Sequence, residues 1–144
     1  MELPNILIDL RNFQKTGKIL GKGKFSKVYV IKEKKTGQKF AAKELKADSY
    51  PTVIDQNCLF NEIFILSRLD YPSIIKFKGF SFTTFNDDNN EMKWQPTIVT
   101  EYVEGVSLMQ RLKDEMIGNA PLEWDDTKRF IVILGVASEM NYLN

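Results

Sequence analysis

The fold is decided by Leu20-Gly21-Lys22-Gly23-Lys24-Phe25-Ser26-Lys27-Val28, a turn that carries two glycines and has an aliphatic residue at each end. Glycines at alternate positions let the backbone approach a ligand without interference from a Cβ atom. The N–H groups of such a turn can point inward and bind phosphate oxygens. The stretch is therefore a candidate phosphate-binding turn, and the residues that follow decide whether it is one.

The sequence around this turn predicts a sheet. β-Branched and aromatic residues bounded by turn signals are typical of strands. The expected strands cover residues 13–20, 28–31, 39–45, 74–82 and 96–103. The first three are close in sequence and predict an antiparallel meander. Residues 1–12 form a lead-in segment whose apolar residues can pack on the domain as a short strand or clip.

One helix is predicted over residues 52–69, and its packing face carries a charge. Apolar residues at helical spacing and one carboxylate share this face: Leu59, Ile63, Leu66 and Glu62. A carboxylate buried without a partner is costly, and Lys43 in the apolar strand 39–45 has the same problem. An ion pair between Lys43 and Glu62 resolves both. The alternative is a rotated helix in which Glu62 faces solvent.

Two further helices are predicted after residue 103. Ser107 is a good N-cap for a short helix that ends near Gly118. The second helix is longer, with acidic residues at its start and an apolar stripe made of Phe130, Ile133, Leu134, Ala137 and Met140. Because their packing partners are not among these residues, we expect both helices to leave apolar surface exposed.

Composition limits the kinds of partner. The 144 residues carry a net charge of +1, which argues against nucleic acid or an anionic membrane as the main partner. Eight lysines in the first quarter of the chain either favour a polyanionic ligand such as a nucleoside triphosphate or form a solvated strand face. The chain has no histidine, so imidazole chemistry is excluded, and we expect no metal site. The polar loop 86–90 lacks the spacing of an EF-hand calcium site.

Cysteine usage and hydropathy indicate a cytoplasmic location. Cys58 is the single cysteine and cannot form an internal disulfide, which suggests a reducing compartment. No secretory signal is present, and no apolar run approaches the ~20 residues that a membrane-spanning helix needs. We therefore expect a cytoplasmic protein that does not span a membrane.

In this order the motifs resemble the N-terminal lobe of the eukaryotic protein kinases. Four features match: the glycine-rich loop at residues 20–28, Ala41-Ala42-Lys43 with the strand lysine, Glu62 in the αC helix, and the hinge at residues 100–105. The resemblance implies an α+β fold with a five-stranded antiparallel sheet and one αC helix, followed by two helices, αD and αE, of an incomplete C-lobe. Residues 13–144 would form the partial kinase domain, with the N-lobe at 13–103 and the hinge exit and first C-lobe helices at 104–144.

The resemblance also implies an ATP site. Leu20, Val28 and Ala41 would cover the adenine, and backbone groups of Glu101 and Val103 would bond its edge. Thr100 would be the gatekeeper, and Ser107 would lie near the ribose. Lys43, positioned by Glu62, would hold the α- and β-phosphates. The loop would cover the phosphates with Gly21, Lys22, Gly23, Lys24, Phe25, Ser26 and Lys27, where Ser26 replaces the third glycine of the family.

The same resemblance implies that these residues lack the catalytic machinery. The His-Arg-Asp catalytic loop and the Asp-Phe-Gly magnesium ligand are absent from the sequence. We therefore expect the ATP-binding part of a truncated protein kinase, of serine/threonine type, that is inactive alone. The intact enzyme would use Mg²⁺ with ATP and act on protein substrates. The alternative is a non-catalytic nucleotide-binding or interaction module, and the coding sequence past codon 144 would distinguish the two.

Overall fold

The structure is a computed structural model. It describes the following ranges: residues 6–46, 53–82 and 95–144. The polar loop 86–90 and the expected first helical residue, Thr52, lie outside them. The chain divides into two compact units, described separately below. The second unit consists of Tyr71–Ile74 and Val103–Asn144, and the first contains the other described residues.

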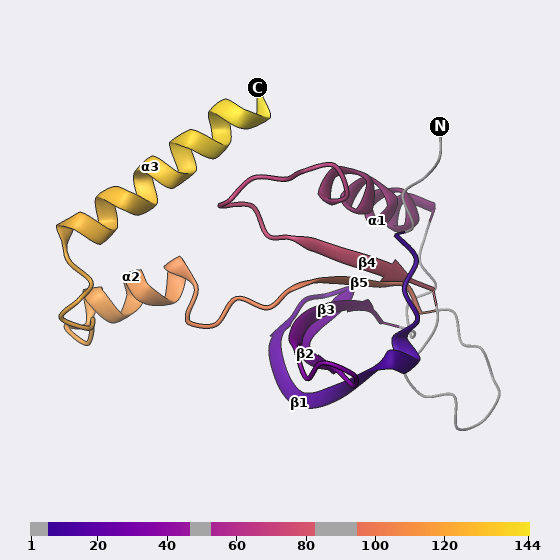
Figure 1. Cartoon of the computed structure of the whole chain (residues 1–144). Coiled ribbons are helices and arrows are strands. Elements are labelled where there is room, and N and C mark those ends of the chain that lie inside the picture. Colours follow the sequence, from indigo (N-terminus) through magenta and orange to yellow (C-terminus); the bar gives the residue numbers. More distant parts are fainter. Residues whose placement is uncertain (1–5, 47–52, 83–94) are drawn as a thin grey trace. The chain divides into compact units, whose positions relative to one another are not determined.

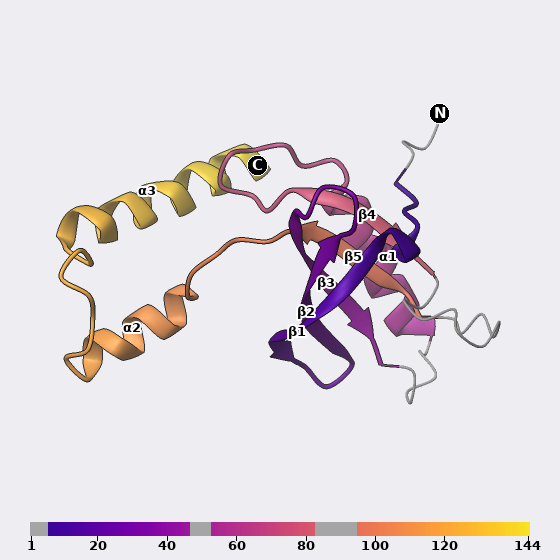
Figure 2. The ribbon, with the colours of Figure 1, turned by 60° about the horizontal axis from the view of Figure 1, so that its bottom comes forward.

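The first unit is built on an antiparallel sheet. Its strands are β1 (Phe13–Lys22), β2 (Ser26–Glu33), β3 (Lys39–Leu45), β4 (Phe77–Ser81) and β5 (Thr97–Glu101). Among the described residues these form one five-stranded sheet in the order β1-β2-β3-β5-β4 (Figures 1 and 2). The predicted sheet is thus confirmed, although β4 and β5 are shorter than expected. β4 begins late because residues before it form a turn, in which the Ile74 N–H donates to the Tyr71 carbonyl at 3.0 Å.

The predicted helix is α1 (Val53–Leu66), which ends earlier than expected. The N–H of Ser67 still donates to the carbonyl four residues back, Ile63, at 2.9 Å. The N–H of Arg68 instead donates to Ile65, three residues back, at 3.1 Å. The last turn therefore tightens to the 3₁₀ geometry that is common where α-helices end.

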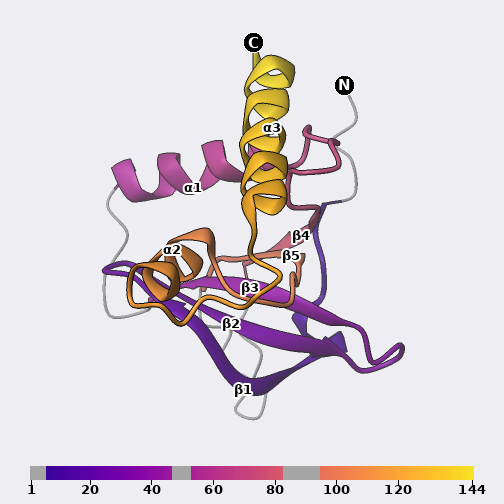
Figure 3. The same cartoon turned by 90° about the vertical axis from the view of Figure 1, so that its left-hand side faces the viewer.

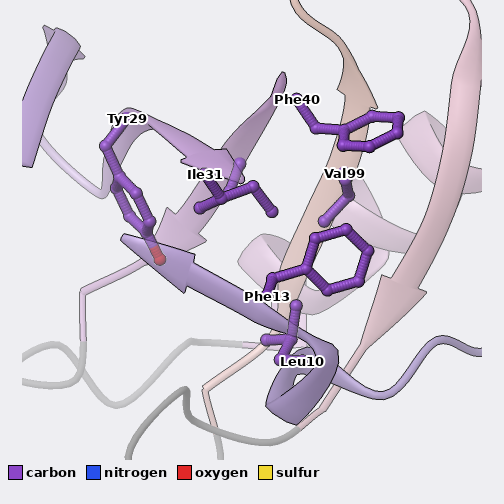
Figure 4. Close-up of a cluster of buried hydrophobic side chains, with 7 residues drawn as sticks. Leu10, Phe13, Tyr29, Ile31, Phe40 and Val99 are labelled. Carbon is purple, nitrogen blue, oxygen red and sulfur yellow. The ribbon is translucent and has the colours of Figure 1, made fainter. Parts of the chain in front are cut away.

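The two faces of the sheet carry separate apolar cores, because successive side chains of a strand alternate between faces. Figure 4 shows the first core, which consists of Leu10, Phe13, Tyr29, Ile31, Phe40, Ala42 and Val99. The second core joins Leu59 and Ile63 of α1 to Phe80 and Ile98 of the sheet. Helix α1 consequently covers the face that carries Ile98 (Figure 3).

The first core also contains a carboxylate. Glu44 is only 9% exposed, and its Oε2 accepts hydrogen bonds from the Tyr29 hydroxyl and, at 3.0 Å, from the Lys15 ammonium. The same ammonium lies 4.5 Å from the centre of the Tyr29 ring. Burial, together with the neighbouring Glu44 carboxylate, raises the pKa of Tyr29 above its ordinary value. The buried charge is thus compensated by a cation and by a neutral phenol.

Residues of the lead-in segment pair with β4, which is an edge strand of the sheet. The Ile8 N–H donates to the Phe80 carbonyl at 2.9 Å, and the Phe80 N–H donates to the Ile6 carbonyl at 2.7 Å. The 3₁₀ turn η1 (Leu10–Asn12) follows, and its Leu10 is completely buried. We call residues 6–12 the strap. A Cβ atom at Gly79 would lie 2.3 Å from Cγ2 of Ile8 and 2.9 Å from the Ile6 carbonyl oxygen, so the strap requires glycine there.

The second unit contains α2 (Leu108–Met116) and α3 (Asp126–Leu143). Ser107 caps α2, as predicted, and its Oγ accepts from the Gln110 N–H at 3.2 Å. Asp125 caps α3 in the same way, with 2.9 Å between its Oδ1 and the Lys128 nitrogen. Neither helix contains a buried residue, so the expected exposure of the apolar faces is confirmed within the described residues. None of the helices in the described ranges is long and apolar enough to cross a membrane.

Tyr29 provides a test of the polar cluster in the first core. We expect Tyr29→Phe to lower the free energy of unfolding by about 1–3 kcal/mol, because Glu44 loses a donor while staying buried. The raised pKa means that the unfolded chain releases this proton first as pH rises. The stability that the Tyr29 hydroxyl adds to the wild type is therefore fully present below pH ~10 and is lost progressively as the pH rises above this value. Urea unfolding at several pH values measures both effects, and an equal loss of stability with pH in the two proteins would contradict the assignment.

Gly79 provides a test of the strap. We expect Gly79→Ala to destabilise the first unit by about 1–3 kcal/mol, because the new methyl group overlaps Ile8 and a backbone oxygen. Amide hydrogen exchange at Ile8 and Phe80 should speed up most. Gly135→Ala in α3 is the matched control, since a Cβ atom there meets open space and alanine favours helix. Unchanged exchange at Ile8 in the Gly79 variant would show that the strap does not depend on this glycine.

Candidate functional site

The strand register gathers four of the predicted site residues on one face of the sheet. Lys43 of β3 lies between Val28 of β2 and Ile98 of β5, which are its partners in the adjacent strands. Ile98 packs against α1, so Lys43 and Val28 face the same way. Ala41, two residues before Lys43, pairs with Thr100 and shares this face. Val28, Ala41, Lys43 and Thr100 therefore lie on the α1 face.

Lys43 forms the predicted ion pair with Glu62 of α1. Its Nζ lies 2.8 Å from Oε1 and 2.6 Å from Oε2 of Glu62. The helix is oriented so that Leu59 and Ile63 are buried and Glu62 reaches the strand. The alternative, a rotated helix with a solvated Glu62, is wrong. The two side chains are 35% and 36% exposed, so the ion pair is only partly buried.

The glycine turn is shorter than the quoted stretch, because β1 runs to Lys22 and β2 begins at Ser26. The Gly23 N–H closes the turn by donating to the Ser26 carbonyl at 2.8 Å. Neither Gly21 nor Gly23 has the positive φ that would demand glycine. A Cβ atom would meet nothing within 4 Å at Gly21 and would come no closer than 3.5 Å, to the Ser26 Oγ, at Gly23. The fold alone therefore does not explain these glycines.

The apolar and basic residues of this turn are exposed. Leu20 and Phe25 are 43% and 47% exposed, and Lys22 and Lys24 are exposed as well. The register between β1 and β2 shifts at Leu20, because Ile19 pairs with Tyr29 and Gly21 with Val28. Such a bulge redirects a side chain, and bulges are common beside binding sites. The exposed residues of the turn are thus available to a ligand.

Lys46 also contacts the turn, although the sequence did not single it out. It follows β3, and its ammonium donates to the Gly23 carbonyl at 2.6 Å. No motif or periodicity marks this residue, because its role depends on tertiary pairing between the end of β3 and the turn. The contact adds a lysine that follows β3 to those of the turn itself.

Glu101, one of the two predicted adenine-edge residues, already uses most of its polar groups in hydrogen bonds within the protein. The Glu101 N–H donates to the Lys76 carbonyl at 2.8 Å, and the Glu101 carboxylate accepts from the Lys76 N–H, also at 2.8 Å. The Glu101 carbonyl accepts from the Thr100 hydroxyl at 3.2 Å and can accept a second hydrogen bond. Only the carbonyl of Glu101 is therefore suited to bind a ligand edge.

Val103 and Ser107 belong to the second unit, so their place in the site stays a prediction. Val103 is 66% exposed, which leaves it accessible. The Ser107 hydroxyl serves as the cap of α2. Across the described residues, no group of three or more His, Cys, Asp and Glu could hold a metal ion. The described site therefore offers a fixed cation, backbone amides and an apolar face, which suits an anionic ligand with an apolar part.

Comparison with known proteins identifies the family that the chain matches. The family model described as "Protein kinase domain" matches residues 14–143. The chain is 32% identical over 127 residues to "Probable serine/threonine-protein kinase PBL24" of Arabidopsis thaliana, covering 88% of this chain and 29% of that protein. It is 31% identical over 126 residues to "Serine/threonine-protein kinase TNNI3K" of Homo sapiens, covering 88% of this chain and 13% of that protein.

A solved structure agrees with the family match. The crystal structure of Rad53 1-466 in complex with AMP-PNP superposes with a TM-score of 0.56 at 28% sequence identity, over 71% of this chain and 24% of that chain. The chain thus spans less than a third of the length of each of these proteins. With the match over residues 14–143 and the paired lysine and glutamate in place, the chain belongs to the protein kinase domain family.

Proposed function

We propose that this chain is the ATP-binding part of a protein kinase that transfers the γ-phosphoryl group of ATP to serine or threonine hydroxyls of proteins. One observation carries the proposal: Lys43 is held by Glu62 at 2.6 Å on the same face as Val28, Ala41 and Thr100. The serine/threonine part draws on the names of the relatives PBL24 and TNNI3K. The reducing cytoplasm, which suits the free thiol of Cys58, is the proposed location.

In this function the ammonium of Lys43 binds phosphate oxygens. The Glu62 carboxylate holds that ammonium from the side of α1, so the cation is in position before the nucleotide arrives. An ammonium has three N–H donors, which allows it to bind a carboxylate and a phosphate together. Phosphoryl transfer relies mainly on positioning and on neutralising phosphate charge, and Lys43 supplies both.

The apolar face and the turn hold the rest of the nucleotide. Val28 and Ala41, with Leu20 of the bulge, contact the adenine ring, and Thr100 limits the space behind it. The Glu101 carbonyl accepts from the adenine edge. The roles of Val103 as a donor to that edge and of Ser107 near the ribose are proposed from the family resemblance alone. The glycine turn covers the phosphates with its N–H groups.

Mg²⁺ generally accompanies ATP in this family, where it neutralises phosphate charge. The Glu62 carboxylate is committed to Lys43, and no group of three or more His, Cys, Asp and Glu in the described part of the chain could hold a metal ion, so we assign no magnesium ligand there. The 144 residues contain neither a His-Arg-Asp nor an Asp-Phe-Gly sequence. These residues therefore bind and orient the nucleotide but lack the base that activates a protein hydroxyl.

Lys43→Met tests the nucleotide site. We expect the variant to bind ATP and ADP about tenfold or more weakly, because the phosphates lose a charge-assisted hydrogen bond, while adenosine binding is unchanged. Titration of each ligand into the 144-residue chain measures this. Lys39→Met, at the other end of β3, is the control for removal of a lysine charge from the same strand. If ATP binds equally to the wild type and to Lys43→Met, or does not bind to the wild type, the proposed site is wrong.

Transfer by the isolated chain is a separate test. We expect no incorporation of labelled phosphate into a generic protein substrate when the purified chain is given ATP and Mg²⁺, because no catalytic base is present. Magnesium-dependent incorporation that disappears in Lys43→Met would contradict this expectation, since a contaminating kinase would be indifferent to the substitution. ATP binding without transfer is also the result expected of a non-catalytic nucleotide-binding module.

A further inference from the structure

Lys46 binds three successive carbonyls of the glycine turn. Its backbone N–H donates to the Phe25 carbonyl at 2.9 Å. Its ammonium donates to the carbonyls of Gly23, at 2.6 Å, and Lys24, at 3.2 Å. Every peptide carbonyl from Gly23 to Phe25 is thus held by one residue at the end of β3.

Because the peptide bonds are trans, these contacts with the carbonyls also determine where the N–H groups of the turn point. In a trans peptide the carbonyl of one residue and the N–H of the next point in opposite directions, and the described chain has no cis peptide. The carbonyls of Gly23 and Lys24 point toward the Lys46 ammonium, and the Phe25 carbonyl points toward the Lys46 backbone nitrogen. The N–H groups of the next residues in each case, Lys24, Phe25 and Ser26, therefore point away from Lys46.

We propose that Lys46 is a positioning residue: its ammonium binds the Gly23 and Lys24 carbonyls of the glycine turn so that the N–H groups of Lys24 and Phe25 face the phosphates of the nucleotide. This proposal rests on the proposed function, because only that function makes a nucleotide the ligand of those N–H groups. Lys46 itself does not touch the nucleotide. Its effect is transmitted through the turn, where carbonyl dipoles would otherwise be free to rotate toward the phosphates and repel them.

A lysine side chain is well suited to bind two carbonyls of the turn. Its ammonium carries three donors on a flexible stem, so it can bind two carbonyls that point in slightly different directions. The Gly23 N–H, which donates to the Ser26 carbonyl at 2.8 Å, closes the turn from the other side. The turn is therefore closed by one bond between its ends and oriented by Lys46, with no further side chain required.

The test compares Lys46→Met and Lys46→Arg in the 144-residue chain, with Lys35→Met as a control. Methionine keeps the backbone bond to Phe25 but removes the ammonium, whereas arginine keeps a cationic donor. Lys35 lies in the turn between β2 and β3 and controls for the change in net charge. The readouts are amide hydrogen exchange of Gly23 without ligand, and the binding of ATP and adenosine.

We expect Lys46→Met to raise the exchange rate of the Gly23 amide about fivefold and to weaken ATP binding about three- to tenfold, with adenosine binding unchanged. Lys46→Arg should restore most of the ATP affinity, and Lys35→Met should match the wild type. Unchanged Gly23 exchange in Lys46→Met, or ATP binding equal to that of the wild type, would overturn the role of Lys46 alone. Absence of ATP binding by the wild-type chain would instead overturn the proposed function, and this role with it.

Discussion

The rest of the first unit is arranged around the ion pair between Lys43 and Glu62. Each side chain interrupts an otherwise apolar surface, β3 in one case and the packing face of α1 in the other. Because both are about one-third exposed, the pair gains little stability, on the order of 0–1 kcal/mol for pairs near the surface. Two apolar residues would pack at least as well. The retention of charge at this contact is therefore explained by ligand binding better than by folding.

One face of the sheet carries a packed core, and the opposite face carries the candidate site. The first core covers one face with Tyr29, Ile31, Ala42 and Val99, and its carboxylate Glu44 is compensated by Tyr29 and Lys15. The opposite face carries α1 and the candidate site. Since adjacent residues of a strand point to opposite faces, Ala42 and Val99 anchor the strands whose neighbours Ala41, Lys43 and Thr100 lie on the face of the candidate site. A packed core on one side thus fixes the positions of the site residues on the other.

Sequence patterns predicted the parts of this arrangement that depend on local periodicity. The bounds of β3, the N-cap of α2 and the pairing of Lys43 with Glu62 follow from local residue patterns, and a misplaced charge is visible in such a pattern. Other contacts between distant segments left no such signal. Strand register brings Lys46 to the turn and Glu44 to Tyr29, and the strap meets Phe80 through backbone bonds that any residue can make. The overlap at Gly79 likewise requires the three-dimensional path of the strap.

The candidate site combines a firmly held part with an easily changed one. Lys43 is fixed by Glu62, beside the core residues Leu59 and Ile63, so moving it disturbs packing. The glycine turn is held by exposed hydrogen bonds from Lys46, each of which contributes about 0.5–1.5 kcal/mol. Opening the turn breaks these exposed hydrogen bonds, whereas moving the lysine of β3 disturbs the packed core beside it. Under the proposed function, the turn can therefore change its conformation without disturbing the core that positions Lys43.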